Sequence, residues 1–280
     1  MTKPFKIIPF VIGLMIYTCT ITYLNYTYFK GKTYQFSLST TLKNYSYIAI
    51  IVELRSLPVT IAVIHNIISH IPYEWPILIF HSEQNLNFIT NSTLQKYIQS
   101  HKISLRQLEK LSTNNTDDYR VWHRYWNTLF TSKTFWLNIP AEKILVFQTD
   151  TIMCSNSPHH IEDFLHYDYI GAPWHLKLNY PQLGGNGGFS LRSKIKTLEL
   201  LEKLKYDYSL NEDGFYSQNL YLVNASLPTR DIAKTFSVET VFYPNPMAIH
   251  LEKGFDVNEA KLLCFNCPEI QMIALNKNYC

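Results

Sequence analysis

Short apolar runs alternate with amphipathic stretches along the middle of the chain. Continuous apolar runs at residues 47–52, 76–80 and 143–147 predict three buried strands. Between the first two, Pro58 stands where a helix could start, and residues 59–71 are apolar at helical spacing. Buried strands that alternate with helices are typical of a mostly parallel sheet covered on both faces. The pattern therefore predicts an α/β fold.

Weaker signals fill the space between these elements. A polar helix is expected near residues 94–100, a weak strand at 103–105, and a long amphipathic helix from about Asp117. One stripe of that helix carries Trp122, Tyr125, Trp126, Leu129 and Phe130. After residue 150 the pattern changes to strands with irregular loops, including a strand-like segment at 236–243. Without a low-complexity linker, one continuous domain of about 250 residues is the economical interpretation.

An apolar stretch of 18 residues without a charge, residues 7–24, lies near the N-terminus between flanking lysines. As a helix it would rise about 27 Å, close to the thickness of a hydrocarbon core. It is longer than a typical signal-peptide core, which favours a signal anchor. A cleaved signal peptide is the alternative, with small residues at 18–20 for the cleavage site.

Composition excludes two broad classes of protein. Apolar residues make up 46% of the 280, so a packed core can form and wholesale disorder is excluded. The 25 Lys and Arg residues exceed the 22 Asp and Glu residues by only three, and they are scattered. A nucleic-acid-binding protein would show a clustered basic face, so no nucleic-acid partner is expected.

Sequons and cysteines bear on the cellular compartment. Asn-x-Ser/Thr sequons begin at Asn25, Asn44, Asn91, Asn114 and Asn224. Four cysteines follow the apolar stretch, an even number that suits an oxidising lumen. Cys264 and Cys267 lack a second Cys/His pair at zinc spacing, so a single C-terminal disulfide is favoured over a zinc site. Cys280 is one candidate partner, and the pairing stays open.

Polar residues stand at the ends of the predicted strands: Glu53 and Arg55, then His81, then Gln148 and Asp150. Ligands of parallel sheets bind outside the carboxyl ends of the strands, so these positions predict a binding site. A carboxylate such as Asp150 can hold a hard divalent cation that neutralises a diphosphate. The alternative is an Asp that caps the next turn.

The segment 184–188, Gly-Gly-Asn-Gly-Gly, holds four of the nine glycines and precedes a predicted strand. Such a cluster implies backbone at positive φ or close approach to a ligand, with a simple tight turn as the alternative. Neither a Gly-Lys-Ser/Thr sequence nor a helix follows, which excludes a P-loop.

Two further positions are candidates for chemistry. Glu212 and Asp213 open an apolar helical stretch, where one of them could act as a general base or both could simply favour the first helical turn. His250 could complete the coordination of a metal held by Asp150, or be structural.

Taken together, these segments resemble a known group of proteins. The resemblance covers roughly residues 45–270, and it rests on the segments 144–151 (ILVFQTDT), 167–174 (YDYIGAPW), 186–192 (NGGFSLR), 211–213 (NED) and 236–240 (FSVET). They are similar to those of a largely uncharacterised, glycosyltransferase-like group classed as a domain of unknown function. The layout is similar to that of GT-A glycosyltransferases, which implies a GT-A-like (Rossmann-like), mostly parallel sheet with helices on both faces.

The resemblance also implies roles for individual residues. Asp150 looks like the remaining carboxylate of a DxD motif, which binds Mn²⁺ or Mg²⁺ on the diphosphate of a nucleotide sugar. Gln148 replaces the first acid of that motif, and its neutral amide weakens the expected metal affinity. The other implied roles are nucleotide contact by Glu53 and Arg55, a substrate-lining loop at Asn186, Gly187 and Gly188, a base at Asp213 or Glu212, and a late metal ligand at His250.

What the resemblance implies is transfer of a sugar from a nucleotide sugar to a glycan, protein or lipid hydroxyl, by an inverting displacement. Residues 1–30 are then a cytosolic tail and signal anchor, 31–45 a short stem, and 46–280 a lumenal catalytic domain of a type II protein in the Golgi or endoplasmic reticulum membrane. The alternative, which Gln148 supports, is a non-catalytic, lectin-like or scaffolding protein of the same fold. A metal-dependent hydrolase would need more clustered His and Asp ligands.

Overall fold

The computed structural model describes residues 44–108, 119–178, 181, 183–250 and 255–273. All of them belong to the second of two units into which the chain divides, Phe36–Cys280. The predicted anchor and nearly all of the predicted stem lie outside the described residues. Among the residues that are described, no helix is long and apolar enough to cross a membrane.

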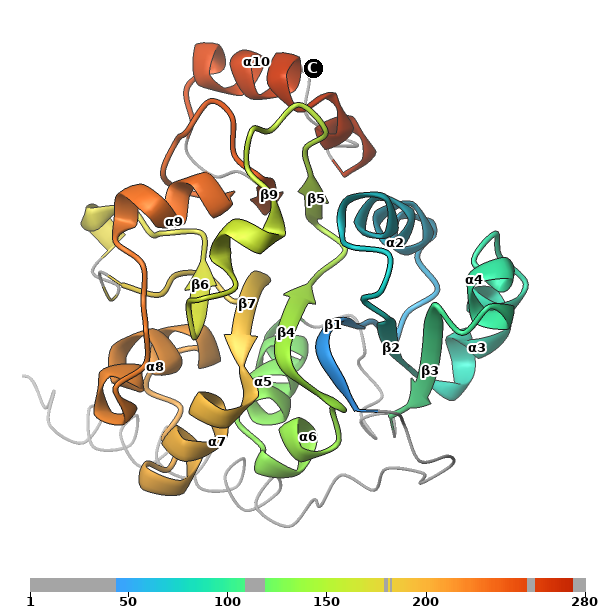
Figure 1. Ribbon diagram of the computed structural model, residues 1–280, viewed down its shortest axis with the longest axis horizontal. Coiled ribbons are helices and arrows are strands. Elements are labelled where there is room, and N and C mark those ends of the chain that lie inside the picture. The colour runs from blue at the N-terminus through green and yellow to red at the C-terminus, as the bar shows by residue number, and fades with distance from the viewer. Residues whose placement is uncertain (1–43, 109–118, 179–180, 182, 251–254, 274–280) are drawn as a thin grey trace, which may run out of the picture. The chain divides into compact units, whose positions relative to one another are not determined.

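Six strands form the central sheet, in the order β3-β2-β1-β4-β7-β6 (Figure 1). They are β1 (Tyr45–Val52), β2 (Ile77–His81), β3 (Ile103–Gln107), β4 (Ala141–Phe147), β6 (Tyr169–Gly171) and β7 (Phe189–Ser193). The strands β3, β2, β1 and β4 pair in parallel, whereas β7 runs antiparallel to both of its neighbours. The predicted α/β fold with a mostly parallel sheet is confirmed, because only β7 is reversed.

The described residues between β1 and β3 form the helices α2 (Pro58–His70), α3 (Glu83–Thr90) and α4 (Gln95–Gln99). Helix α2 begins at Pro58, whose fixed φ suits a first helical position. Its Val63 and Ile67 are fully buried in a core that also holds Ala49 and Ile51 of β1. The sequence pattern did not predict α3, which begins after Ser82 with a capping box.

The face of the sheet opposite to α2 is covered by α5 (Tyr119–Phe130), α6 (Lys133–Leu137) and α7 (Lys194–Lys203) (Figure 1). Phe135 of α6 packs on Phe80 of β2, with ring centroids 5.1 Å apart. The predicted apolar stripe of α5 divides in the structure. Tyr125, Leu129 and Phe130 are buried in the core, whereas Trp122 and Trp126 are only partly buried.

A second, three-stranded sheet follows, in the order β5-β9-β8. It contains β5 (Thr151–Met153), β8 (Ser237–Val238) and β9 (Ala248–His250). The later helices are α8 (Glu212–Asn219), α9 (Arg230–Phe236) and α10 (Val257–Asn266), with short 3₁₀ turns at η1 (Ile161–Phe164), η2 (Leu176–Leu178), η3 (Leu220–Val223) and η4 (Pro268–Met272).

Two expectations for this second half of the chain were wrong. Besides the helical stretch expected to open at Glu212 and Asp213, which is α8, three further α-helices (α7, α9 and α10) follow residue 150 in the described part, where only strands and loops were expected. The strand expected at 236–243 is reduced to Ser237 and Val238, because only these two residues find a partner, on β9. Phe236 instead ends α9, where it is fully buried against Phe189.

A disulfide ties the second sheet to α10. It joins Cys154, which follows β5, to Cys267, which ends α10, across 113 residues of sequence. Both cysteines are buried in an apolar cluster with Ile152, Ile249 and others. The expectation of a single disulfide confined to the C-terminus was therefore wrong. Cys264 is disulfide-bonded as well, and Cys280 lies outside the described residues.

Removal of this cross-link should destabilise the protein. For the double variant Cys154→Ala/Cys267→Ala we expect a loss of about 2–5 kcal/mol in the free energy of unfolding, since the link restricts a long loop of the unfolded chain. Urea denaturation of the variant and the wild type measures the difference. An unchanged denaturation midpoint would contradict the prediction.

Candidate functional site

The site lies where the strand order of the sheet reverses direction. From β1 the chain passes through α2 to β2 and β3 on one side, and β4 then joins β1 on the other side. Open α/β sheets bind ligands at such a switch point, outside the carboxyl ends of the strands. A pocket of about 780 Å³ is found there. Its lining residues are Val52, Glu53, Arg55, Trp122, His123, Trp126, Asn127, Gln148, Thr149, Asp150, Trp174, Leu178, Asn186, Gly188, Asn211, Glu212, Asp213, Glu239, Thr240 and His250.

At the end of β1, Glu53 and Arg55 form a bidentate ion pair. Nε and Nη2 of Arg55 donate to the two carboxylate oxygens of Glu53, each at 2.8 Å. Asn85 of the α3 capping box donates from Nδ2 to the backbone oxygens of both residues, which fixes the loop. The guanidinium of Arg55 also lies over the ring of Trp122, 5.3 Å from its centroid. This corner of the pocket therefore holds the aromatic ring of Trp122 and the guanidinium of Arg55, which Glu53 keeps in place.

After β4, the turn from Gln148 to Thr151 carries Asp150 into the pocket. The backbone N–H and the hydroxyl of Thr151 both donate to the backbone oxygen of Gln148, which closes the turn. Thr151 pairs with His250 in the β5–β9 ladder, so the second sheet brings His250 beside Asp150 from 100 residues further along the chain. Oδ1 of Asp150 lies 3.5 Å from Nε2 of His250.

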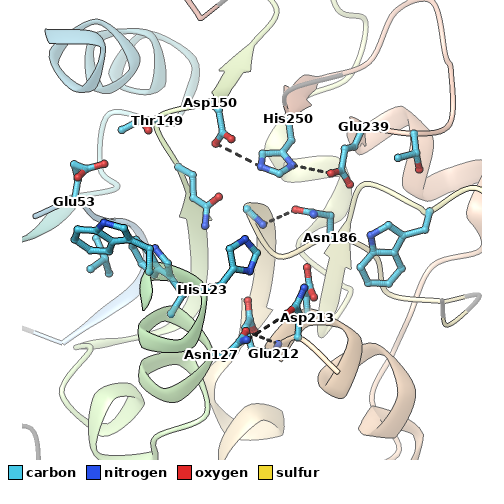
Figure 2. Close-up of a pocket in the computed structure, with 18 of the residues that line it drawn as sticks. Glu53, His123, Asn127, Thr149, Asp150, Asn186, Glu212, Asp213, Glu239 and His250 are labelled. Carbon is cyan, nitrogen blue, oxygen red and sulfur yellow. Dashed lines mark hydrogen bonds and ion pairs between the residues drawn. The ribbon is translucent and has the colours of Figure 1, made fainter. Parts of the chain in front are cut away.

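On its other side, Nδ1 of His250 lies 3.8 Å from Oε1 of Glu239. Figure 2 shows Asp150, His250 and Glu239 in a row across one end of the pocket. Asp150 is the most accessible of the three, with 40% of its side chain exposed, whereas His250 and Glu239 are buried. A buried carboxylate thus lies on the side of the imidazole that faces away from Asp150.

These residues fit a cation that the substrate helps to coordinate. Mg²⁺ and similar cations are often held by one or two protein groups, with phosphate oxygens and water completing the shell. Asp150 offers a carboxylate oxygen and His250 a ring nitrogen at one place. The described residues contain no cluster of three or more His, Cys, Asp or Glu side chains that could hold a metal without a ligand.

The backbone of the glycine segment 184–188 passes very close to other residues of the pocket. Gly184 and Gly185 have φ angles of 93° and 110°, which glycine adopts without strain. At Gly188, a Cβ atom would lie 2.3 Å from Nε2 of His250 and 2.8 Å from Oε1 of Gln148. The expectation of positive φ or close approach is confirmed, and the close approach is to the protein's own pocket side chains.

Two acidic residues open α8 at the opposite end of the pocket (Figure 2). Asn127 of α5 accepts the backbone N–H of Glu212 at 2.9 Å and so caps this helix from outside. Asp213 accepts hydrogen bonds from the backbone N–H groups of Gly187, at 3.1 Å, and Gly214, at 2.7 Å. Burial and the charge of Glu212 raise the pKa of Asp213 to about 6, although these two donors oppose the shift.

Most of the residues proposed from the sequence line this one pocket. Glu53, Arg55, Gln148, Asp150, Asn186, Gly188, Glu212, Asp213 and His250 all do so. Gly187 lies behind the lining, where it contacts Glu212 and Arg192. His81 is not among the lining residues: it is buried, and its Nδ1 is hydrogen-bonded to the backbone oxygen of Ser82. The structure therefore does not bring His81 to the pocket.

One face of α5 contributes lining residues that the sequence argument missed. Trp122, His123, Trp126 and Asn127 follow the spacing i, i+1, i+4 and i+5, which places them on one side of a helix. Figure 2 shows His123 in the middle of the pocket, between Asp150 and Asp213. The two tryptophans belong to the apolar stripe predicted for this helix, and a polar His and Asn at neighbouring positions of the same face are a signal for a site.

A family model decides the family of the chain. The model of a family described as proteins of unknown function, DUF5672, matches residues 107–250. The chain belongs to the DUF5672 family. The match includes the segment from Asp150 to His250 but not the Glu53–Arg55 corner. The expectation of a family of unknown function is thereby confirmed.

No curated protein matches this DUF5672 protein. Among solved structures it is similar to the apo form of the glycosyltransferase GlyE of Streptococcus pneumoniae, with a TM-score of 0.47 and 12% identity over 76% of this chain and 56% of that one. The chain thus spans just over half the length of GlyE.

Two further solved structures are similar to it. A mannosyltransferase from Pyrobaculum calidifontis in complex with GDP-Man and Mn²⁺ gives a TM-score of 0.44 at 10% identity, over 92% of this chain and 72% of that one. TarS of S. aureus in complex with UDP-GlcNAc gives 0.42 at 11% identity, over 84% and 72%.

The raised pKa of Asp213 predicts a pH-dependent cost in stability. Between its ordinary pKa of 3.8 and about 6 the folded protein binds more protons than the unfolded chain, so this group stabilises less and less as the pH rises through that window. The free energy of unfolding of Asp213→Asn minus that of the wild type should therefore increase by on the order of 1–3 kcal/mol between about pH 4 and about pH 7. Urea denaturation at a series of pH values measures this, and a difference independent of pH would contradict it.

Proposed function

We propose that this protein is a glycosyltransferase of the GT-A type, which transfers a sugar from a nucleotide sugar to an acceptor hydroxyl. The observation that carries the proposal is the arrangement of the pocket at the β1–β4 switch point. Asp150 and His250 lie at one end of it, and Asp213, with a pKa near the physiological range, lies at the other. A donor diphosphate needs groups that hold a cation, as Asp150 and His250 would, and an acceptor hydroxyl needs a base, as Asp213 would provide.

The donor would lie along the carboxyl ends of β1 and β4. The ring of Trp122 offers a stacking surface for a nucleobase, and Arg55 beside it offers N–H donors to polar atoms of the nucleotide. Asp150 and His250 would hold a divalent cation, Mn²⁺ or Mg²⁺, on the diphosphate. When bound, this cation supplies positive charge that stabilises the diphosphate as a leaving group. Gln148 adds no charge, so the phosphates have to provide most of the affinity for the cation.

Asp213 would act as the general base of an inverting displacement. The acceptor oxygen forms a bond to the anomeric carbon, the bond from that carbon to the diphosphate oxygen breaks, and the hydroxyl proton passes to the Asp213 carboxylate. With a pKa of about 6, Asp213 is mostly ionised at neutral pH and can accept this proton. The N–H groups of Gly187 and Gly214 hold the carboxylate in place while it does so.

We also propose that the protein works in the lumen of the Golgi or endoplasmic reticulum as a type II membrane protein. The Cys154–Cys267 disulfide and the second disulfide-bonded cysteine, Cys264, suit an oxidising compartment. Of the five sequons, those at Asn44, Asn91 and Asn224 fall in the described residues, and all three asparagines are exposed. The apolar stretch at residues 7–24 supports a membrane anchor.

Donor binding should require Asp150. We expect one class of nucleoside diphosphate to raise the melting temperature of the full-length protein when Mn²⁺ is present. A ligand at 100 times its Kd adds about 2.7 kcal/mol to the free energy of unfolding. The variant Asp150→Asn should lose this shift, whereas Asp231→Asn, on the surface of α9, should keep it. No shift with any nucleotide would contradict the proposal and favour the lectin-like alternative.

Turnover should require Asp213. In Asp213→Asn, release of nucleoside diphosphate from the donor should fall by about 10²–10⁴-fold, because the general base is lost, while donor affinity is unchanged. In the wild type, kcat/KM should fall below about pH 6 as Asp213 becomes protonated. A coupled assay for nucleoside diphosphate, with a panel of sugars as acceptors, measures both. Binding without turnover in the wild type would contradict an enzymatic role.

A further inference from the structure

Arg192 of β7 is a charged side chain that is completely buried behind the pocket. Its Nη1 and Nη2 donate to the two carboxylate oxygens of Glu212 at 2.7 and 2.9 Å. Nη2 also donates to the backbone oxygen of Gly187 at 3.2 Å, and Nε donates to Oγ of Ser190 at 2.9 Å. One guanidinium therefore connects β7, the glycine segment and the first turn of α8.

Aromatic rings enclose this guanidinium. Its central carbon lies 5.0–5.6 Å from the ring centroids of four residues from four elements, namely Tyr169, Phe130, Tyr216 and Trp136. Rings at this distance attract a cation through their π faces and exclude water from it. Because the charge has no solvent to replace its hydrogen bonds, Arg192 depends on Glu212 for neutralisation.

The same network limits what Glu212 can do. Both of its carboxylate oxygens accept from Arg192, although its side chain is still 11% exposed at the pocket. Gly187 fits between the partners only because it has no side chain: a Cβ would lie 2.4 Å from Oε1 of Glu212 and 2.5 Å from Nη2 of Arg192. The N–H of this same glycine then donates to Oδ2 of Asp213.

We propose that Arg192 is a positioning residue: it fixes Glu212 and the Gly187 backbone in place, so that Asp213 alone of the two adjacent acids takes the proton from the acceptor. This inference rests on the proposed function and separates two residues that the sequence leaves equivalent. Glu212 serves as a fixed negative charge beside Asp213, and Arg192 prevents it from competing for the proton.

The charged and titratable groups around Asp213 come from several elements. Glu212 precedes it on α8, Arg192 faces it from β7, Tyr169 from β6, and Tyr206 from the segment before α8. Of the two ions, Glu212 raises the pKa of Asp213 and Arg192 lowers it. A substitution that removes the charge of Glu212 but keeps its shape should therefore lower the pKa of Asp213 toward its ordinary value.

The decisive variant is Glu212→Gln, which preserves volume and one acceptor oxygen for Arg192. In full-length protein labelled with ¹³C at the aspartate carboxyl carbons, the Asp213 signal, assigned with Asp213→Asn, should titrate with a pKa lowered from about 6 toward 3.8. The matched control is Glu53→Gln, which alters the other Glu–Arg pair at this pocket and should leave that pKa unchanged. An Asp213 pKa that does not move in Glu212→Gln would overturn the proposal.

Kinetics then separate the roles of the two acids. Glu212→Gln removes one of the two acceptor oxygens for Arg192, so it should lower kcat, but by less than Asp213→Asn, which loses turnover, and it should shift the acid limb of the pH profile downward. The variant Arg192→Lys keeps the positive charge but cannot make the two parallel hydrogen bonds to Glu212. It should therefore lower kcat, while the KM for the donor stays constant. Loss of turnover in Glu212→Gln as complete as in Asp213→Asn would identify Glu212 as the base. The NMR titration needs no turnover, so it gives its result even if the proposed transferase activity fails.

Discussion

The parallel pairing of β1 with β4 is the constraint on which the site depends. β1 is bonded to β2 on one edge and to β4 on the other, and the connections that leave β1 and enter β4 run in opposite directions across the sheet. At such a reversal of strand order the neighbouring connections diverge, which leaves a hollow between the carboxyl ends of the two strands. Glu53 and Asp150 stand just beyond those two ends, and α5, the glycine segment, α8 and β9 bring further groups to the pocket.

Two features from later in the chain complete the pocket: the β5–β9 ladder and the glycine segment. In each of them, two backbone segments lie close together. The short β5–β9 ladder places His250 beside Asp150, since Thr151 and His250 are partners in it. The segment with Gly187 and Gly188 then packs between this pair and α8, which side chains at either position would prevent. The disulfide at Cys154 holds the second sheet from behind, three residues beyond the β4 turn.

The buried Arg192–Glu212 pair is the costly element of this design. Removing both ions from water costs several kcal/mol each, and the cost is offset only because the fork is complete and the surrounding rings attract the cation. Such a pair adds little to stability compared with apolar residues of the same volume, so stability alone does not account for its presence beside the pocket. It holds the first turn of α8 in one position relative to β7, and Asp213 is the next residue along that turn.

By itself, the sequence determined the local elements whose signal is contained in one stretch of chain. Three buried strands, α2 and the positions just beyond β1 and β4 follow from apolar runs and Pro58, and the motifs indicated the residues of the pocket. Tertiary structure decided what depends on partners distant in sequence. Trp122 and Trp126 line the pocket, where Arg55 lies over the ring of Trp122, and His81 is buried with its ring hydrogen-bonded to the backbone oxygen of Ser82. The proposed choice of Asp213 over Glu212 rests on the contact of Glu212 with an arginine 20 residues away, which no local pattern can indicate.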